Sequence, residues 1–354
     1  MLCKLGRSQQ LVTRRGLPTV CNKDFRYWSR TLCVCLLTVM VVVACGGSQS
    51  TGPKKLRLGL VLLDVTNQTM NDIYLGAKAH AAALGTVDIL EGGTSETGPW
   101  LTACERIVNS GIDVLAYVPL DPAGASTCIK QANDKSIKVI CIFACTSQGR
   151  SDLTVTIDFL ADGKQIGTWM GKAVGSGEVG FLDARDEATQ GFGKGFKAGL
   201  AESCPGCNLV VDVDGGHDRD TGYTISLQAL TAHPNIKGMY GTGDDIAMGI
   251  LRAIQQLGRA GKIKVAGHDG TCEALASILK GELGFTMLFA GQPFGINVVD
   301  AALKLHAGQA VAAANVTSIP LDQATEKGLL DGSIPNPTGV DVKARLQKAQ
   351  SGCQ

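Results

Sequence analysis

Carboxylate, amide, imidazole and aromatic side chains gather where the apolar segments of this chain end. They occupy Asp64 to Met70, Phe143, Asp183 to Asp186, His217, Gly243 to Asp245, His268 with Asp269, and Phe289 to Gln292. Groups of these types hydrogen bond to the hydroxyl groups of a bound solute, or they act as acids and bases in catalysis. The motifs around them and the elements that carry them decide between these two kinds of chemistry.

Motifs that would indicate catalysis are missing from the sequence. There is no Gly-x-Ser-x-Gly elbow, and the glycine-rich loops lack the Lys-Ser/Thr pair that binds phosphate. The His-Asp pairs at 217–218 and 268–269 are adjacent in the sequence, which does not by itself make a catalytic pair. We therefore expect a binding protein that is not an enzyme and that uses no cofactor.

Apolar runs alternate with amphipathic ones along most of the chain. Leu56–Leu63 is followed by a polar segment and then by an amphipathic stretch, Asp72–Leu84, that ends at Gly85. The same alternation of apolar and amphipathic segments begins again near Asp158, and helices are expected over 163–174 and 295–308. Such alternation predicts an α/β fold of two doubly wound lobes, each with a parallel sheet covered on both faces. The segment from Pro335 has little apolar content and is expected on the surface.

Ligands of an open parallel sheet bind beyond the carboxyl ends of its strands, where the chain turns into helices. Two facing lobes would make a cleft, and the polar groups named above would line it. The chain has 33 basic and 32 acidic residues and no basic stripe, so nucleic acid is not an expected partner. Its 45 glycines are expected in tight turns between strands and helices.

The N-terminal segment has the order of a secretory signal: basic residues, a short apolar run from near Thr31, and small residues before a cut. Val42-Val43-Ala44-Cys45 resembles a bacterial lipobox. That resemblance implies removal of residues 1–44 and lipidation of Cys45, which places the chain on the extracytoplasmic face of the cell membrane, in the periplasm or at the cell surface. A plain signal peptide or a retained membrane helix is the alternative, although a spanning helix needs about 20 apolar residues.

Eight cysteines follow Cys45, and an even number in an exported protein favours disulfides. Cys104 and Cys128 are expected on neighbouring helices. Cys204-Pro-Gly-Cys207 is a turn that would close a short loop. It would also form half of a zinc site, but no second Cys or His pair stands at ligand spacing, so disulfides or free thiols are favoured over a metal.

Four stretches together resemble the sugar-type, ribose-binding-protein-like periplasmic substrate-binding proteins of ABC importers. They are residues 58–85 with Asn67, residues 156–167, Leu230 to Gly249, and Val265-Ala266-Gly267-His268-Asp269-Gly270-Thr271. The resemblance covers roughly 56–320 and implies two lobes joined by three crossings, near 145–158, 290 and 319. The expected parts are a tether at 45–55, one lobe of 56–156 and 290–318, a second lobe of 157–289 and 319–345, and a tail at 346–354.

The same resemblance assigns ligand residues. Asn67 matches an amide and Asp269 a carboxylate that bond sugar hydroxyls, while His217 stands where an aromatic ring often stacks. Phe143-Ala144 replaces an Asp-Arg pair, and Phe289 replaces a Gln or Asn. The full expected set is Asn67, Phe143, Arg185, Asp186, His217, Asp244, Asp269, Phe289 and Gln292.

Several replacements remove hydroxyl-binding partners and an aromatic clamp that the resembled proteins have. Phe192 falls where a ligand arginine is expected, Gly243 replaces an Asn, and Gln68-Thr69-Met70 replaces a Pro-Phe-Phe type sequence. They disfavour ribose and favour another small polyhydroxylated or partly apolar solute. For Asp244, capping a helix N-terminus is as well supported as contact with the ligand. For Arg185 and Asp186, a place in a solvated surface turn is an equal alternative to ligand contact.

These observations predict a monomeric, lipid-anchored receptor that hands a small sugar, polyol or similar compound to the permease subunits of an ABC importer. The sequence does not distinguish this importer receptor from the same receptor coupled to a sensor or chemoreceptor. An exported enzyme is a further alternative. A LacI-like repressor shares the two-lobed fold, but no helix-turn-helix precedes residue 56, and the export signal argues against it.

Overall fold

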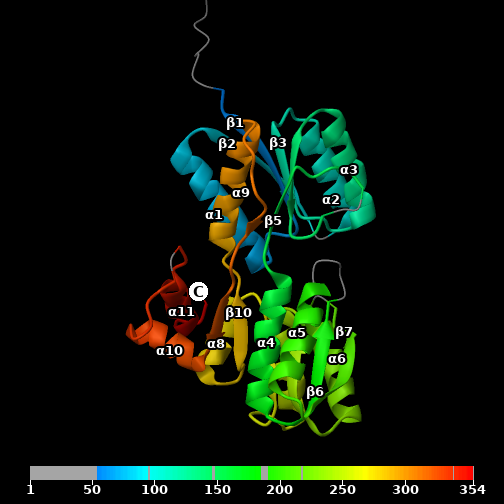
Figure 1. The fold of residues 1–354 in the computed structure, drawn as a ribbon, viewed down its shortest axis with the longest axis vertical. Helices are drawn as coiled ribbons and strands as arrows, with labels where there is room; N and C mark the ends of the chain where they lie inside the picture. Colours follow the sequence, from blue (N-terminus) through cyan, green and yellow to red (C-terminus); the bar gives the residue numbers. More distant parts are fainter. Residues whose placement is uncertain are drawn as a thin grey trace, which may run out of the picture. The chain divides into compact units, whose positions relative to one another are not determined.

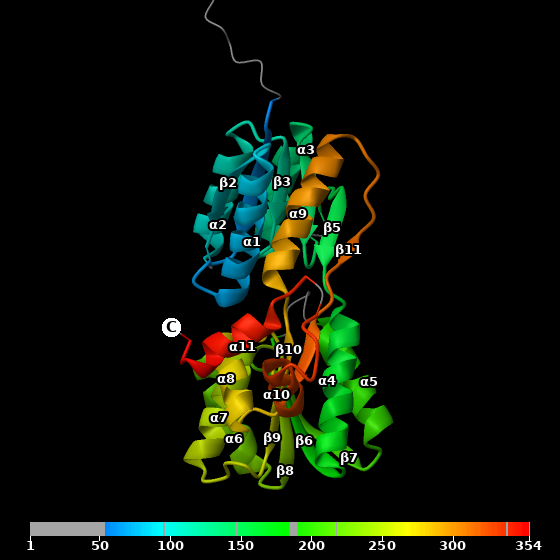
Figure 2. The same cartoon turned by 90° about the vertical axis from the view of Figure 1, so that its left-hand side faces the viewer.

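The computed structural model describes residues 54–94, 96–145, 148–184, 190–216, 218–337 and 339–353. Within these ranges the apolar runs form strands and the amphipathic runs between them form helices (Figures 1 and 2). The described strands pair in two separate six-stranded sheets. This architecture confirms the predicted α/β class.

The first sheet is parallel throughout. Its strands, in hydrogen-bonding order, are β11 (Ala314–Asn315), β5 (Leu153–Thr156), β4 (Lys138–Ile142), β3 (Val114–Tyr117), β1 (Leu56–Leu62) and β2 (Val87–Gly93). Successive residues of a strand face opposite sides. Leu58 and Leu60 therefore share a core with α1 (Gln68–Leu84) and α9 (Gly291–His306), whereas Val61 shares one with α2 (Thr97–Val108) and α3 (Pro122–Asp134).

The second sheet is parallel except for one edge strand. Its order is β12 (Ile319–Asp322), β10 (Phe285–Leu288), β9 (Lys264–Ala266), β8 (Ile236–Gly241), β6 (Gly177–Asp183) and β7 (Cys207–Asp214), with β12 antiparallel to β10. On one face, Phe181 and Tyr240 pack with α4 (Phe159–Val174) and α5 (Gln190–Ser203). On the other, Leu182 and Met239 pack with α6 (Arg219–Ala232), α7 (Asp244–Gln256) and part of α8 (Cys272–Lys280).

All described residues belong to one compact unit, in which the chain passes three times from one sheet to the other. The passages lie between β5 and α4 at 157–158, between β10 and α9 at 289–290, and between β11 and β12 at 316–318. Each follows the end of a strand. The carboxyl ends of the strands therefore lie near the points at which the chain changes sheets.

Three of the helices begin about one turn earlier than the sequence pattern predicts. Helix α1 starts at Gln68 because the side chain of Asn67 accepts a hydrogen bond from the backbone N–H of Met70. Helix α4 starts at Phe159 because Asp158 caps it in the same way through Ala161. Short polar side chains before a helix satisfy N–H groups that have no partner within the helix. Helix α9 also starts early, at position 291, without a side-chain cap.

Many glycines lie in contacts between helices, where only turns were expected. A Cβ atom on Gly163 would lie 2.3 Å from the carbonyl oxygen of Phe192, and one on Gly167 would lie 2.2 Å from that of Phe196. A Cβ on Gly295 of α9 would lie 2.1 Å from the carbonyl oxygen of Ile73 on α1. Glycine therefore lets the backbones of α4 with α5, and of α1 with α9, approach more closely than any side chain allows.

The C-terminal segment packs against the rest of the fold, whereas its low apolar content predicted that it lies on the surface. Helix α10 (Gln323–Asp331) leads to α11 (Val342–Gln350), in which Val342 and Leu346 are fully buried against α8 and α10. A disulfide between Cys272 and Cys353 ties the end of this segment to the start of α8.

Two further disulfides join the cysteines that the sequence singled out. Cys104 of α2 is bonded to Cys128 of α3, and Cys204 is bonded to Cys207. The neighbouring-helix prediction is confirmed, and the disulfide at 204–207 is one of the two states that the sequence favoured over a metal. Among the described cysteines, Cys141 and Cys145 remain as thiols.

Candidate functional site

Asn67 and Gln68 stand at the N-terminus of α1, which follows the carboxyl end of β1 after a short loop. Asn67 is exposed; its oxygen caps the helix at 3.2 Å from the Met70 nitrogen, and its amide nitrogen has no hydrogen-bond partner among the described residues. The Gln68 oxygen accepts a hydrogen bond of 3.1 Å from the backbone N–H of Cys272, at the start of α8. This bond joins a segment packed on the first sheet to one packed on the second.

Asp269 lies after β9, in a backbone conformation that non-glycine residues rarely adopt. Its φ angle is +115°, and its backbone is held on β10 by bonds from its N–H to Met287 and from the Phe289 N–H to its carbonyl. Strain of this kind costs roughly 1–3 kcal/mol and is concentrated at functional sites. The side chain is 30% exposed. Two residues separate Asp269 from Cys272, so the Gln68 bond brings the neighbourhoods of Asn67 and Asp269 together.

Phe143 is the centre of an aromatic cluster that combines side chains from elements on both sheets. Its φ angle is +68°, and its ring lies 6.1 Å from Phe159 of α4, 5.7 Å from Phe289 and 5.1 Å from Phe294 of α9, measured between centroids. Phe159 in turn lies 4.9 Å from Phe192 of α5. Phe143 and Phe159 are only partly buried, whereas the other three are buried. The cluster gives this region an apolar surface that has no charged group of its own.

Asp244 is buried, and both of its oxygens are bonded inside its own part of the fold. Oδ1 accepts from the Thr286 hydroxyl at 2.8 Å, and Oδ2 accepts from the Thr271 N–H at 2.7 Å. The helix cap is Gly243, not Asp244. Burial, together with the neighbouring Asp269 charge, raises the pKa of Asp244 to about 8. Its side chain thus supports the loop that carries Asp269, and direct contact with a solute stays a prediction.

His268 is the buried basic group beside these carboxylates. Burial disfavours its charged form, but hydrogen bonds to Asp162 and Asp269 outweigh that effect and raise its pKa to about 9. Its ring lies 4.4 Å from that of Phe192. Sequence reasoning noted His268 only as the neighbour of Asp269 and missed Asp162, whose position inside an amphipathic helix carries no distinguishing signal.

The remaining predicted residues lie in the aromatic cluster, on α9 or outside the described ranges. Phe289 is buried in the aromatic cluster, and Gln292 is exposed in the first turn of α9, where its backbone packs against Gly76. Arg185, Asp186, His217 and the lipidation candidate Cys45 lie outside the described residues. No group of three or more His, Cys, Asp or Glu side chains in the described ranges is arranged to hold a metal ion.

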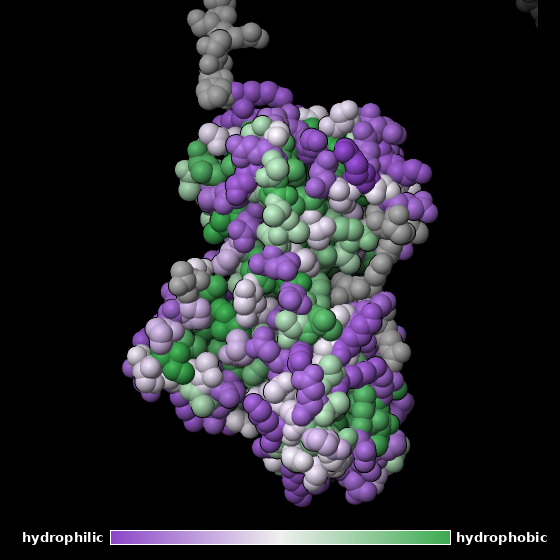
Figure 3. Space-filling model, viewed as in Figure 1, coloured by the Kyte–Doolittle hydropathy of each residue, from purple (hydrophilic) through white to green (hydrophobic). Residues whose placement is uncertain are grey.

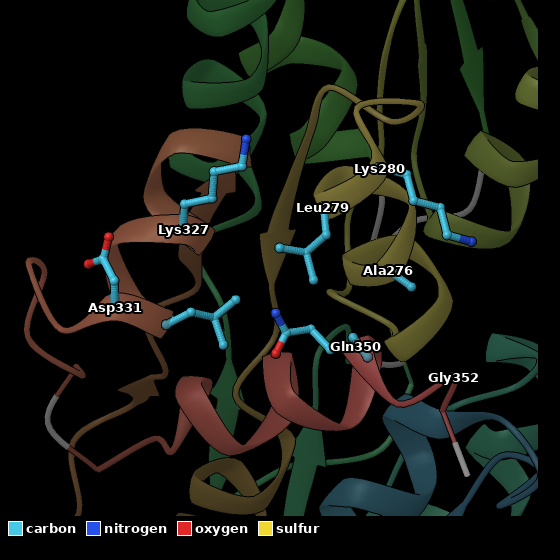
Figure 4. A pocket seen from close by; sticks show the side chains of 9 residues that line it. Ala276, Leu279, Lys280, Lys327, Asp331, Gln350 and Gly352 are labelled. Carbon is cyan, nitrogen blue, oxygen red and sulfur yellow. The ribbon is translucent and has the colours of Figure 1, made fainter.

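A separate groove of about 840 Å³ lies between α8, α10 and α11 (Figure 4). Leu279 and Leu330 form part of its lining, and Lys280, Lys327 and Asp331 bring charges to it. None of the described ligand candidates lines this groove, so it is distinct from the site after β1 and β9. On the face drawn in Figure 3, hydrophilic and hydrophobic residues are intermixed.

Comparison with known proteins agrees with this architecture. The family described as periplasmic binding protein domain matches residues 58–310 of the chain. The chain belongs to the periplasmic binding protein family. The resemblance predicted from the four sequence stretches is thereby confirmed, and membership of this family implies an extracytoplasmic location.

Curated relatives of this periplasmic binding protein are solute receptors and not enzymes. It is 26% identical over 283 residues to the ribose import binding protein of Bacillus subtilis, covering 79% of this chain and 90% of that protein. It is 25% identical over 324 residues to the D-allose-binding periplasmic protein of Escherichia coli, covering 88% of this chain and 98% of that one.

Solved structures show the same fold. An ABC transporter solute binding protein from Bacillus halodurans with bound myo-inositol matches with a TM-score of 0.72 at 17% identity, over 84% of this chain and 100% of that chain. One from Mycobacterium smegmatis with bound glycerol matches with a TM-score of 0.70 at 23% identity, over 78% and 96%. These likenesses confirm the predicted type I periplasmic binding protein fold. Across the described residues, no helix is long and apolar enough to cross a membrane.

Proposed function

We propose that this protein is an extracytoplasmic receptor that binds a small sugar, polyol or similar polyhydroxylated compound and delivers it to the permease subunits of an ABC importer. The observation that carries the proposal is the Gln68–Cys272 bond, which links the segment of Asn67, after β1, to the segment of Asp269, after β9. The amide nitrogen of Asn67 would donate to a hydroxyl oxygen, and the Asp269 carboxylate would accept from a hydroxyl group. Because polar groups that a bound solute covers lose free energy when they are left unpaired, they would reject solutes that lack the hydroxyls.

The aromatic cluster supports a solute with an apolar edge. Phe143 and Phe159 are the partly exposed rings, and Phe143 stands where the resemblance implies a polar partner for sugar hydroxyls. Aromatic rings bind the C–H faces of sugars and deoxysugars through dispersion and burial of apolar area. We infer a small ring-shaped or branched polyol with fewer hydroxyl contacts than ribose makes in the resembled proteins.

We further propose two lobes, 56–156 with 290–318 and 157–289 with 319–345, that close on the solute as a monomer. A solute that contacts both lobes stabilises the closed arrangement relative to the open one, so closure reports occupancy. Lipidation of Cys45 would keep the receptor at the extracytoplasmic face of the cell membrane, beside its permease.

Isothermal titration with D-ribose, D-allose, myo-inositol, glycerol and L-fucose tests the proposal on the mature protein. We expect at least one micromolar ligand, with heat lost in Asp269→Ala and retained in the matched control Asp220→Ala, whose side chain is 87% exposed. Mass spectrometry of solutes that co-purify with the protein extends the panel. An inert panel with no co-purified polyol, or unchanged binding by Asp269→Ala, would overturn the assignment.

A further inference from the structure

His268 is held between two carboxylates that come from different elements. Its Nδ1 lies 3.1 Å from Oδ1 of Asp269, and its Nε2 lies 3.2 Å from Oδ2 of Asp162, on α4. Its side chain is 3% exposed, and Phe192 covers the ring. The imidazole therefore has a fixed orientation, because turning it would break both bonds.

The network continues to the third passage between the sheets. Ser318, which lies between β11 and β12, donates a hydrogen bond of 2.5 Å from its hydroxyl to the same Oδ2 atom of Asp162. Both Ser318 and Asp162 are buried. A continuous chain of hydrogen bonds therefore runs from Asp269, through His268 and Asp162, to a segment that joins the two sheets.

Both ring nitrogens of His268 face acceptors, so both must carry a proton for both bonds to form. A neutral imidazole has one N–H and could donate to only one carboxylate. The charged groups that face the ring are Asp162 and Asp269, with Asp244 of α7 also acting on it electrostatically. The raised pKa of His268 agrees with a ring that is protonated at neutral pH.

We propose that His268 is a positioning residue for solute binding: its two hydrogen bonds hold the Asp269 carboxylate at the mouth of the site and connect it through Asp162 to Ser318. This inference rests on the proposed function of Asp269. With Oδ1 bonded to the imidazolium, Oδ2 has no hydrogen-bond partner among the described residues and would be left to accept from a hydroxyl group of the solute. The bond from the imidazolium fixes the Asp269 carboxylate, and a fixed acceptor loses less entropy on binding than a mobile one.

Two variants of similar polarity separate positioning from simple structural support. In His268→Asn the amide nitrogen stands near the place of Nδ1 and keeps the bond to Asp269. In His268→Gln it stands near the place of Nε2 and keeps the bond to Asp162 instead. Each variant loses one bond and the positive charge, so both should lower the midpoint of thermal unfolding by similar amounts.

Affinity is measured by titration of the wild type and both variants with the tightest-binding member of the D-ribose, D-allose, myo-inositol, glycerol and L-fucose panel. If His268 positions Asp269, His268→Gln should weaken binding about tenfold or more, because it loses the charged hydrogen bond that fixes Asp269. His268→Asn keeps a bond to Asp269 and should stay within about threefold of the wild-type affinity. Equal losses in both variants, or no loss in either, would refute the role of His268. A wild type that binds no member of the panel would instead count against the proposed function.

Discussion

At the scale of single residues, buried ionisable groups are the feature with the clearest energetic consequence. Glu326 on α10 is fully buried, and neither carboxylate oxygen has a hydrogen-bond partner among the described residues. Burial, with a smaller contribution from the charge of Asp322, raises its pKa from 4.5 to about 8. The unfolded chain releases this proton above about pH 4.5, whereas the folded protein keeps it until about pH 8. The free energy of unfolding therefore falls as the pH rises through that window.

Glu326→Gln should remove this pH-dependent fall in the free energy of unfolding, because the amide is neutral at every pH. We expect the variant and the wild type to be equally stable near pH 4, and the variant to be more stable at pH 8 by on the order of 4 kcal/mol. Urea unfolding followed by circular dichroism from pH 4 to 8 measures the difference. Glu202→Gln, which changes an exposed side chain on α5, is the control and should show no comparable pH-dependent gain. A pH-independent difference for Glu326→Gln would contradict the explanation.

Residue types at strand ends were readable from the sequence, but their contacts were not. Asn67 and Asp269 follow apolar runs, and that position alone predicted that they lie at the carboxyl edges of their sheets. The bonds of Asp162 to His268 and Ser318 join residues 106 and 156 positions apart. No local pattern encodes such contacts, because they depend on the register in which whole elements pack.

At the scale of elements, strands and their order along the chain were predictable because a doubly covered strand must be apolar along its whole length. Helix starts were not, because several polar residues before each helix compete to be the cap. Asp64 and Asn67 both precede α1, yet Asp64 binds the Thr66 N–H in a turn while Asn67 caps the helix. The glycine contacts were also missed, since a glycine looks alike in a turn and in a tight helix crossing.

The close approach of α4 and α5 predicts a large cost for side chains at their contact. In Gly167→Ala the new methyl group would lie 2.2 Å from the Phe196 carbonyl oxygen, a backbone atom that moves only if a helix moves. We expect a loss of roughly 1–3 kcal/mol in the free energy of unfolding. Gly98→Ala on α2, where nothing lies within 4 Å of the added atom, is the matched control and should be neutral or slightly stabilising. Chemical denaturation of both variants decides the point; equal stabilities would show that the two helices separate freely.

At the scale of the whole described unit, contacts made by α11 connect the parts built on the two sheets. The disulfide from Cys272 to Cys353 fixes the end of α11 to α8. From the same helix, Arg345 forms an ion pair of 2.8 Å with Asp72 of α1, and both side chains are largely buried. Together with the Gln68–Cys272 bond, this pair holds α1 close to the second sheet's helices. These contacts exist only while the two parts are together.

Breaking the ion pair should therefore favour separation of the two parts. For Arg345→Ala we expect a larger radius of gyration in small-angle X-ray scattering of the solute-free protein, and about a two- to tenfold weaker affinity for the tightest member of the sugar and polyol panel. The charge swap Asp72→Arg with Arg345→Asp should restore most of both quantities, because the attraction is re-formed with its ends exchanged. Arg252→Ala, which breaks an exposed pair within one part, should change neither. If Arg345→Ala has the dimensions and affinity of the wild type, the pair contributes nothing to closure, and α11 acts only as a cover for α8.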